Sequence, residues 1–200
     1  MVNLLKALRI LALASILLSP VAQAGVMNIP TYIPSGAFGL GIEPELILSD
    51  GAGIGINGRF QYGLSDLSNI HFLVGNGQGP KLFRTSATIT FDFFPDIEGQ
   101  PGIGLALKAG YVNLATGGRF DTVALPYIQK TINGKGGTFT PYLAIPLGIG
   151  FTAQGTYAAL SSAVIGSAFK ISDQFRYYLE VGIGMWNTET YFSTGLMIYP

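Results

Sequence analysis

The chain has 200 residues, of which 11 are basic and 11 acidic, and it contains no cysteine. The lack of cysteine excludes disulfides, thiolate catalysis, cysteine-ligated metals and a lipid-modified N-terminal cysteine. Charged residues make up only 11% of the chain, against about 25% in an average soluble domain, and no basic patch indicates nucleic acid binding. The composition therefore favours contact with lipid.

Residues 1–24 have the features of a secretory signal peptide, in the usual order. Lys6 and Arg9 precede an apolar run over residues 10–18, which is too short to cross a bilayer as a helix. Ala22-Gln23-Ala24 then forms a small-x-small cleavage site, so we expect cleavage after Ala24. An amphipathic or anchoring helix is the alternative. Residues 25–35 show no pattern and are interpreted as an N-terminal lead or a partial plug.

From residue 36 to residue 64, apolar side chains alternate with glycine, polar or charged ones. The apolar set is Phe38, Leu40, Ile42, Leu46, Leu48, Ile54, Ile56, Phe60, Tyr62 and Leu64. A period of two is typical of a β-strand with one apolar and one polar face. No segment after residue 24 has the roughly 18 consecutive apolar residues of a spanning helix. A closed β-sheet, in which every backbone group is paired, is therefore the structure expected to span the bilayer.

The pattern continues to the C-terminus and predicts ten strands, although eight or twelve are possible. The ranges are 36–48, 53–64, 68–76, 81–93, 102–113, 120–132, 138–152, 157–170, 174–186 and 190–199. Each is near the length that crosses a bilayer at a tilt, and the loops are short on both sides. We therefore expect an all-β fold, a closed antiparallel transmembrane β-barrel over residues 36–200. An even strand number would place both ends on the periplasmic side.

Two features refine this prediction. Several lipid-facing sets end in aromatic residues, as in Phe83 to Phe93 and Phe139 to Phe151, which fits the aromatic girdles of membrane interfaces. Proline inside a strand cannot donate to the ladder, so we expect bulges or register shifts at four positions. These are Pro44, Pro126, Pro141 and Pro146.

The chain resembles the small outer-membrane β-barrels of Gram-negative bacteria, because a signal peptide precedes a mature segment with alternating apolar and polar residues. That broad class includes the OmpA-like, OmpX-like and OmpW-like proteins, and the resemblance rests on no specific motif. It implies location in the bacterial outer membrane, contact with outer-membrane lipid, and insertion by the barrel-assembly machinery. The terminal aromatic residue usual in the class is displaced here, because Pro200 follows Tyr199.

The polar phase of the strands would line the lumen. A charge network or constriction is expected from Glu43, Glu45, Arg59, His71, Arg84, Asp92, Lys108, Arg176 and Glu180, with Asn57, Gln61 and Asn69 on the same face. We predict that Arg59 pairs with one of the two neighbouring glutamates, and that Arg176 and Glu180 pair with Lys108, Asp92 or other neighbours. The network either fills a narrow barrel or lines a conducting or ligand-binding path.

Glycines occupy the same face in the outer half of several strands. They are Gly53, Gly55, Gly75, Gly148, Gly150, Gly182 and Gly184. One hypothesis is an open, water-filled vestibule above the charged middle of the lumen. The alternative is that glycine allows curvature or close packing of larger partners.

The expected function is passive: a narrow channel for small solutes, or a structural barrel with a largely closed lumen. Ten strands are too few for the wide pore of a 16-stranded porin. The alternative is an envelope binding protein whose surface or lumen binds a lipid or protein partner. No enzyme activity, cofactor or metal is expected. His71 is the only histidine and is interpreted as a lumen residue with satisfied hydrogen bonds. Glu43 and Glu45 are interpreted as salt-bridged rather than as an acid–base pair.

Overall fold

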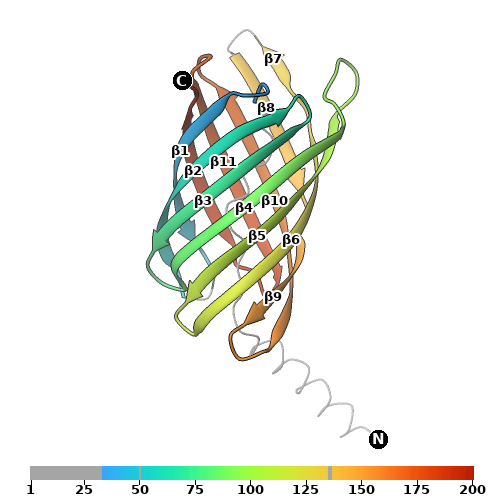
Figure 1. The fold of residues 1–200 in the computed structure, drawn as a ribbon. Helices are drawn as coiled ribbons and strands as arrows, with labels where there is room; N and C mark the ends of the chain where they lie inside the picture. Colours follow the sequence, from blue (N-terminus) through green and yellow to red (C-terminus); the bar gives the residue numbers. More distant parts are fainter. Residues whose placement is uncertain (1–32, 50, 135–136) are drawn as a thin grey trace, which may run out of the picture.

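Twelve β-strands form one antiparallel sheet in the computed structural model, which describes residues 33–49, 51–134 and 137–200 (Figure 1). The strands are β1 (Phe38–Ile47), β2 (Gly53–Ser65), β3 (Ser68–Gly77), β4 (Lys81–Phe94), β5 (Gly102–Leu114), β6 (Gly117–Gln129), β7 (Ile132–Gly134), β8 (Gly137–Ala144), β9 (Leu147–Thr152), β10 (Tyr157–Lys170), β11 (Phe175–Trp186) and β12 (Tyr191–Ile198). The predicted signal peptide, and residues 25–32 of the predicted lead, lie outside the described residues.

The sheet closes on itself because β1 pairs with β12. Leu40 lies opposite Ile198, and Ile47 lies opposite Tyr191. Closure leaves no free strand edge, which is the condition for a sheet to sit in hydrocarbon. Within the described residues no helix is long and apolar enough to cross a membrane.

The barrel wall has ten strand positions, as the sequence predicts. β8 and β9 form one position because both pair with β6 on one side and with β10 on the other. β7 continues the line of β6 beyond the wall and pairs with the start of β8. The predicted closed antiparallel barrel of about ten strands is therefore confirmed.

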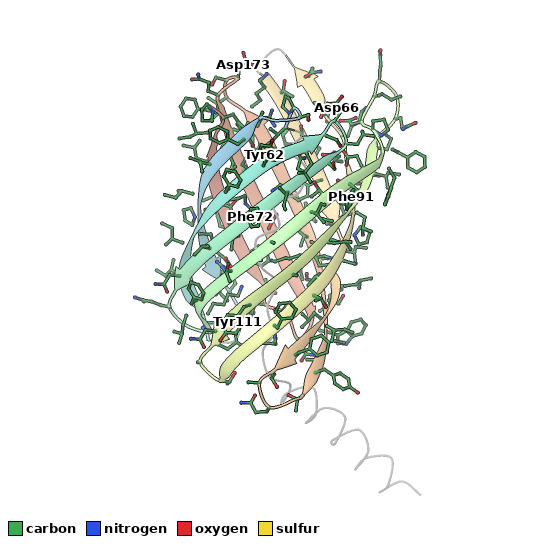
Figure 2. All side chains as sticks on the ribbon, viewed as in Figure 1. Tyr62, Asp66, Phe72, Phe91, Tyr111 and Asp173 are labelled. Carbon is green, nitrogen blue, oxygen red and sulfur yellow. The ribbon has the colours of Figure 1, made fainter. Side chains whose placement is uncertain are left out.

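The alternation of the sequence becomes an outer apolar face and an inner polar face. Leu40, Ile42, Ile54 and Ile56 are all at least half exposed on the outside, whereas Glu43 and Glu45 between them are 1% exposed. Exposed apolar side chains continue around the barrel, between 39% and 57% exposed, at Leu107, Leu143, Ile149, Ile165, Val181 and Ile183. Figure 2 shows Tyr62, Phe72, Phe91 and Tyr111 over the outer wall. Such a belt matches the lipid-facing surface of a membrane barrel.

The expectation of bulges at the four prolines is wrong. Register shifts occur instead at Gly63/Ser65, Lys81/Phe83, Asp92/Phe94 and Ser161/Ser162. Pro44 sits in β1 while the register with β12 is the same on both sides of it. Pro146 divides β8 from β9, and the neighbouring Ile145 N–H still bonds to the Pro126 carbonyl at 3.1 Å. Each proline in these strands lacks one backbone N–H donor, and the register of the neighbouring strands is unchanged.

Two apolar clusters pack inside the barrel. One joins Ala106, Leu125, Tyr127, Tyr142, Ala144 and Val164. The other joins Ile33, Ala168, Tyr178, Met197 and Tyr199. Because Ile33 is 1% exposed among these inward-facing side chains, the described end of the predicted lead, residues 33–35, lies at the end of the barrel where β1 begins and β12 ends. We call this end the terminal mouth.

Candidate functional site: the charged lumen

The centre of the lumen holds a two-point ion pair between adjacent strands. Arg59 on β2 donates from Nε to Glu43 Oε1 at 2.5 Å and from its terminal nitrogen to Glu43 Oε2 at 3.0 Å. Both side chains are almost completely buried. The predicted pairing of Arg59 with a neighbouring glutamate is confirmed. It arises because β1 and β2 form a hairpin in which Gly41, not a bulkier residue, lies directly opposite Arg59.

A second network, centred on Glu45, joins three further strands or loops. Its carboxylate accepts hydrogen bonds from Lys81 Nζ at 3.0 Å and from Arg84. Lys81 also pairs with Glu189 at 2.7 Å. Asn57 connects this network to the first, since it accepts from Arg84 Nε at 2.6 Å and donates to the Glu43 carbonyl at 3.1 Å. The buried charges of this half of the barrel therefore form one connected system.

Two more groups of polar side chains complete the lumen. Arg119 bonds to both carboxylate oxygens of Asp121 at 2.6 and 2.8 Å. Glu180 accepts hydroxyl hydrogen bonds from Tyr142 and, at 2.6 Å, from Tyr191. The structure places strong donors on Glu43, Glu45, Asp121 and Glu180, as burial of charge requires.

Neither Lys108 nor Asp92 is among the contacts described for Arg176 and Glu180, and Glu180 pairs with other neighbours, Tyr142 and Tyr191. Asp92 accepts hydrogen bonds from Tyr127 and Gln129 instead. Lys108 makes no hydrogen bond or ion pair with any residue of the described ranges. Arg176 lies over the ring of Tyr199, 4.7 Å from its centroid. Tyrosine hydroxyls, which the charge pattern did not consider, take the places expected for charged partners.

His71 also departs from expectation. It is 2% exposed, yet neither ring nitrogen has a hydrogen-bond partner among the described residues. It lies opposite Gln61 on β2 and Thr88 on β4. The predicted lumen position is correct, whereas the predicted satisfied hydrogen bonds are absent.

The hypothesis of an open vestibule in the outer half of the lumen is contradicted, because large side chains occupy the space beside these glycines. A side chain at Gly182 would overlap the ring of Tyr191, and one at Gly150 would press against Arg119 and Asp121. At Gly75 the space is taken by Asn57 and Arg84. These glycines allow close packing of larger partners, which was the alternative.

Sequence reasoning missed several buried lumen residues. They are Lys81, Thr90, Arg119, Asp121, Gln129, Ser161, Ser162, Glu189 and Ser193. Lys81 was placed at a strand start, and the bulge at Lys81/Phe83 reverses the phase so that Lys81 and Arg84 both point inward. Glu189 lies between the predicted strands 174–186 and 190–199, so no alternation points it inward. Asp121 lies in the predicted strand 120–132, where apolar and polar residues do not alternate clearly.

The terminal mouth contains a cavity of about 390 Å³. Its lining includes Asp66, Leu67, Asp92, Asp96, Gln129, Lys170 and Arg176. Figure 2 shows Asp66 and Asp173 at this end of the barrel. Burial acts to raise the pKa of Asp96, but Lys130 Nζ at 2.9 Å and the Thr131 donors outweigh it, so this pKa lies below its usual range.

The charged groups of the lumen are mostly held by one another. Among the described residues no three of His, Cys, Asp and Glu stand close enough to hold a metal ion. The lumen carboxylates Glu43, Glu45 and Asp121 are each bonded to a cation. Their arrangement supports structure and electrostatics inside a barrel.

Comparison with solved structures finds similar folds at very low sequence identity. The COG4313 outer membrane channel from Pseudomonas putida F1 has a TM-score of 0.51 and 8% identity, over 89% of this chain and 100% of that one. A de novo designed transmembrane β-barrel has a TM-score of 0.42 and 12% identity, over 85% and 100% of the two chains. OmpT of Vibrio cholerae, in its trimer form, has a TM-score of 0.38 and 8% identity, over 82% and 98%.

These likenesses concern the fold alone. The chain has the fold of a bacterial outer-membrane β-barrel. No family model and no curated protein matches the sequence. The narrower resemblance to OmpA-like, OmpX-like and OmpW-like proteins therefore stays a prediction.

Proposed function

We propose that the protein is an integral barrel of the bacterial outer membrane whose lumen is kept largely closed by its own charge network. The single observation that carries the proposal is the connected set of buried ion pairs from Glu43–Arg59 to Glu45 with Arg84 and Lys81. Balanced and paired charges fill a small barrel, whereas a selective pore more often shows a ring of one sign. The proposal includes no catalytic step and no cofactor, and its partners are outer-membrane lipid and the assembly machinery.

Planar-bilayer recordings of the refolded protein test this function. We expect no discrete conductance steps from the wild-type barrel. The variant Glu45→Ala/Arg84→Ala removes two large side chains from the lumen and should conduct. Asp173→Ala, which disrupts an exposed pair with Lys170, is the matched control and should stay silent. Steps from the wild-type protein that change in Arg59→Ala or Glu45→Ala would instead establish a narrow channel.

A second candidate function is lipid binding on the outer wall. A groove of about 860 Å³ crosses β3, β4, β5, β6 and β9. Its lining includes the small residues Ala87, Ala109 and Thr122 and the larger residues Ile89 and Leu107. The groove lies in the apolar belt, so an acyl chain of an outer-membrane lipid is the occupant that fits.

Native mass spectrometry of detergent-extracted protein tests the second candidate. The wild-type barrel should retain a lipid that Ala109→Phe, which adds bulk to the lining of the groove, does not retain. Ile165→Phe adds similar bulk to an exposed position outside the groove and should leave retention unchanged. Equal retention in all three proteins would remove lipid binding at this groove from consideration.

A further inference from the structure

Lys108 differs from four other lumen cations of the described residues. Arg59, Lys81, Arg84 and Arg119 each pair with at least one carboxylate. Lys108 extends from the inner face of β5, between Ala106 and Gly110, and has no such partner among the described residues. A buried or partly buried charge without a counter-charge is costly, so its electrostatic surroundings need an explanation.

The charged groups that act most strongly on Lys108 are mostly cations. They are Arg84, Arg59 and Lys81, and Asp121 is the acidic group that acts against them. The three cations pair with Glu43 or Glu45, and both carboxylate oxygens of Asp121 are bonded to Arg119. Lys108 therefore has no ion pair of its own among the described residues, and a low-dielectric lumen favours a counter-ion beside it.

A second group beside Lys108 lacks a partner. The two nitrogens of His71 are buried and make no hydrogen bond within the described residues. Buried polar groups are nearly always hydrogen-bonded, so such an exception indicates a missing partner. A neutral imidazole carries one N–H donor and an imidazolium carries two, so His71 can donate to an anion in either state.

The register of the sheet brings these two groups to one row. His71 lies opposite Thr88, and Thr88 lies opposite Lys108. Two strand spacings place the His71 and Lys108 backbones about 10 Å apart, and side chains that point into a closed barrel converge. Lys108 is partly exposed. Val123 lies directly opposite it on β6, and its other neighbours on the same inner face are small. They include Ala106, Gly110, Ser86 and Gly148.

We propose that the lumen binds a small monovalent inorganic anion, of the size of chloride, between Lys108 and His71, with the Thr88 hydroxyl at the same row. The ammonium supplies the opposite charge and the imidazole supplies an N–H. The anion balances the charge of Lys108 in the same way that the Glu43 carboxylate balances the charge of Arg59. This inference does not depend on whether the barrel conducts, because either a closed or an open lumen can hold a counter-ion.

Urea unfolding of the refolded barrel at constant ionic strength tests the site, with chloride exchanged for the bulky anion gluconate. A ligand that binds only the folded state raises the folding constant in proportion to its concentration above Kd. We expect up to a tenfold rise per tenfold of chloride in wild type, and none in Lys108→Met. Lys130→Met, which removes a lysine paired with Asp96 at the terminal mouth, should keep the wild-type response.

A bromide-soaked crystal of the wild-type barrel gives an answer that does not depend on whether Lys108→Met folds. An anomalous peak within hydrogen-bond distance of Lys108 Nζ or a His71 ring nitrogen would support the site. The absence of such a peak, or an equal chloride response in wild type and Lys108→Met, would overturn it. A peak seen only elsewhere on the barrel would likewise count against the site.

Discussion

Glu45 is the position where loss of one side chain should disturb the barrel most. Its side chain is 0% exposed, and its two carboxylate oxygens bond to different cations, Lys81 at 3.0 Å and Arg84. At 3.0 Å and an effective dielectric constant of about 20, one such contact has a gross attraction of about 5 kcal/mol. Desolvation offsets much of this in the intact pair, but removal of one partner leaves the desolvation cost without the attraction.

We expect Glu45→Leu to lower the free energy of unfolding by about 3–5 kcal/mol, the usual cost of breaking a buried ion pair from one side. At 1.4 kcal/mol per tenfold, the folding constant falls by about two to nearly four orders of magnitude. Urea unfolding in lipid vesicles measures this change. Trp186 is the single tryptophan of the chain and is exposed at the end of β11, so its fluorescence reports unfolding of the barrel.

The double variant Glu45→Leu/Arg84→Met distinguishes a charge effect from a packing effect. Removing the cation that Glu45 leaves behind should restore much of the lost stability, because contacting residues in one network couple strongly. Asp173→Leu is the matched control, since that carboxylate is almost fully exposed, and its midpoint should stay at the wild-type value. A Glu45→Leu midpoint equal to wild type, or a double variant less stable than the single one, would refute the reasoning.

Two further predictions concern the packing of the lumen and the lipid face. Gly182→Ala should lower the free energy of unfolding by about 1–3 kcal/mol through overpacking, because the new methyl group meets the Tyr191 ring. Gly58→Ala has room for the methyl group and should leave the stability nearly unchanged. Comparison of the urea midpoints of the two variants checks this. Leu107→Arg should cost about 2–4 kcal/mol near the bilayer midplane, and Ile132→Arg at the rim about 0–1 kcal/mol. The two side chains are similarly exposed, so equal costs in vesicles would contradict the placement of the membrane.

One contact of the lumen could be anticipated from local pattern. The pairing of Arg59 with Glu43 follows from a hairpin between two adjacent segments, and a hairpin brings nearby residues of the chain together. The partners of Glu180 could not be anticipated in the same way. Tyr142 lies 38 residues from it in the sequence, and only the order and register of β8, β10 and β11 bring the two side chains together.

The sequence by itself determined which face of each strand meets lipid and which meets the lumen. Alternation with a period of two is a local property, because successive side chains of a strand point to opposite sides. It therefore identified the apolar belt around Leu40 and Ile56 and the buried position of Glu45, and it led to the prediction of a closed barrel. It did not fix the strand number, since eight or twelve strands fit the same alternation.

Only the tertiary structure decided the closure and the partners inside. The pairing of Leu40 with Ile198 joins the two ends of the barrel, and no local pattern encodes a contact of that sequence separation. The bulge at Lys81/Phe83 turns Lys81 into the lumen against the simple alternation. Lumen contacts depend on the register of strands distant in sequence, and for that reason the structure, rather than the charge pattern, showed that Lys108 has no partner among the described residues.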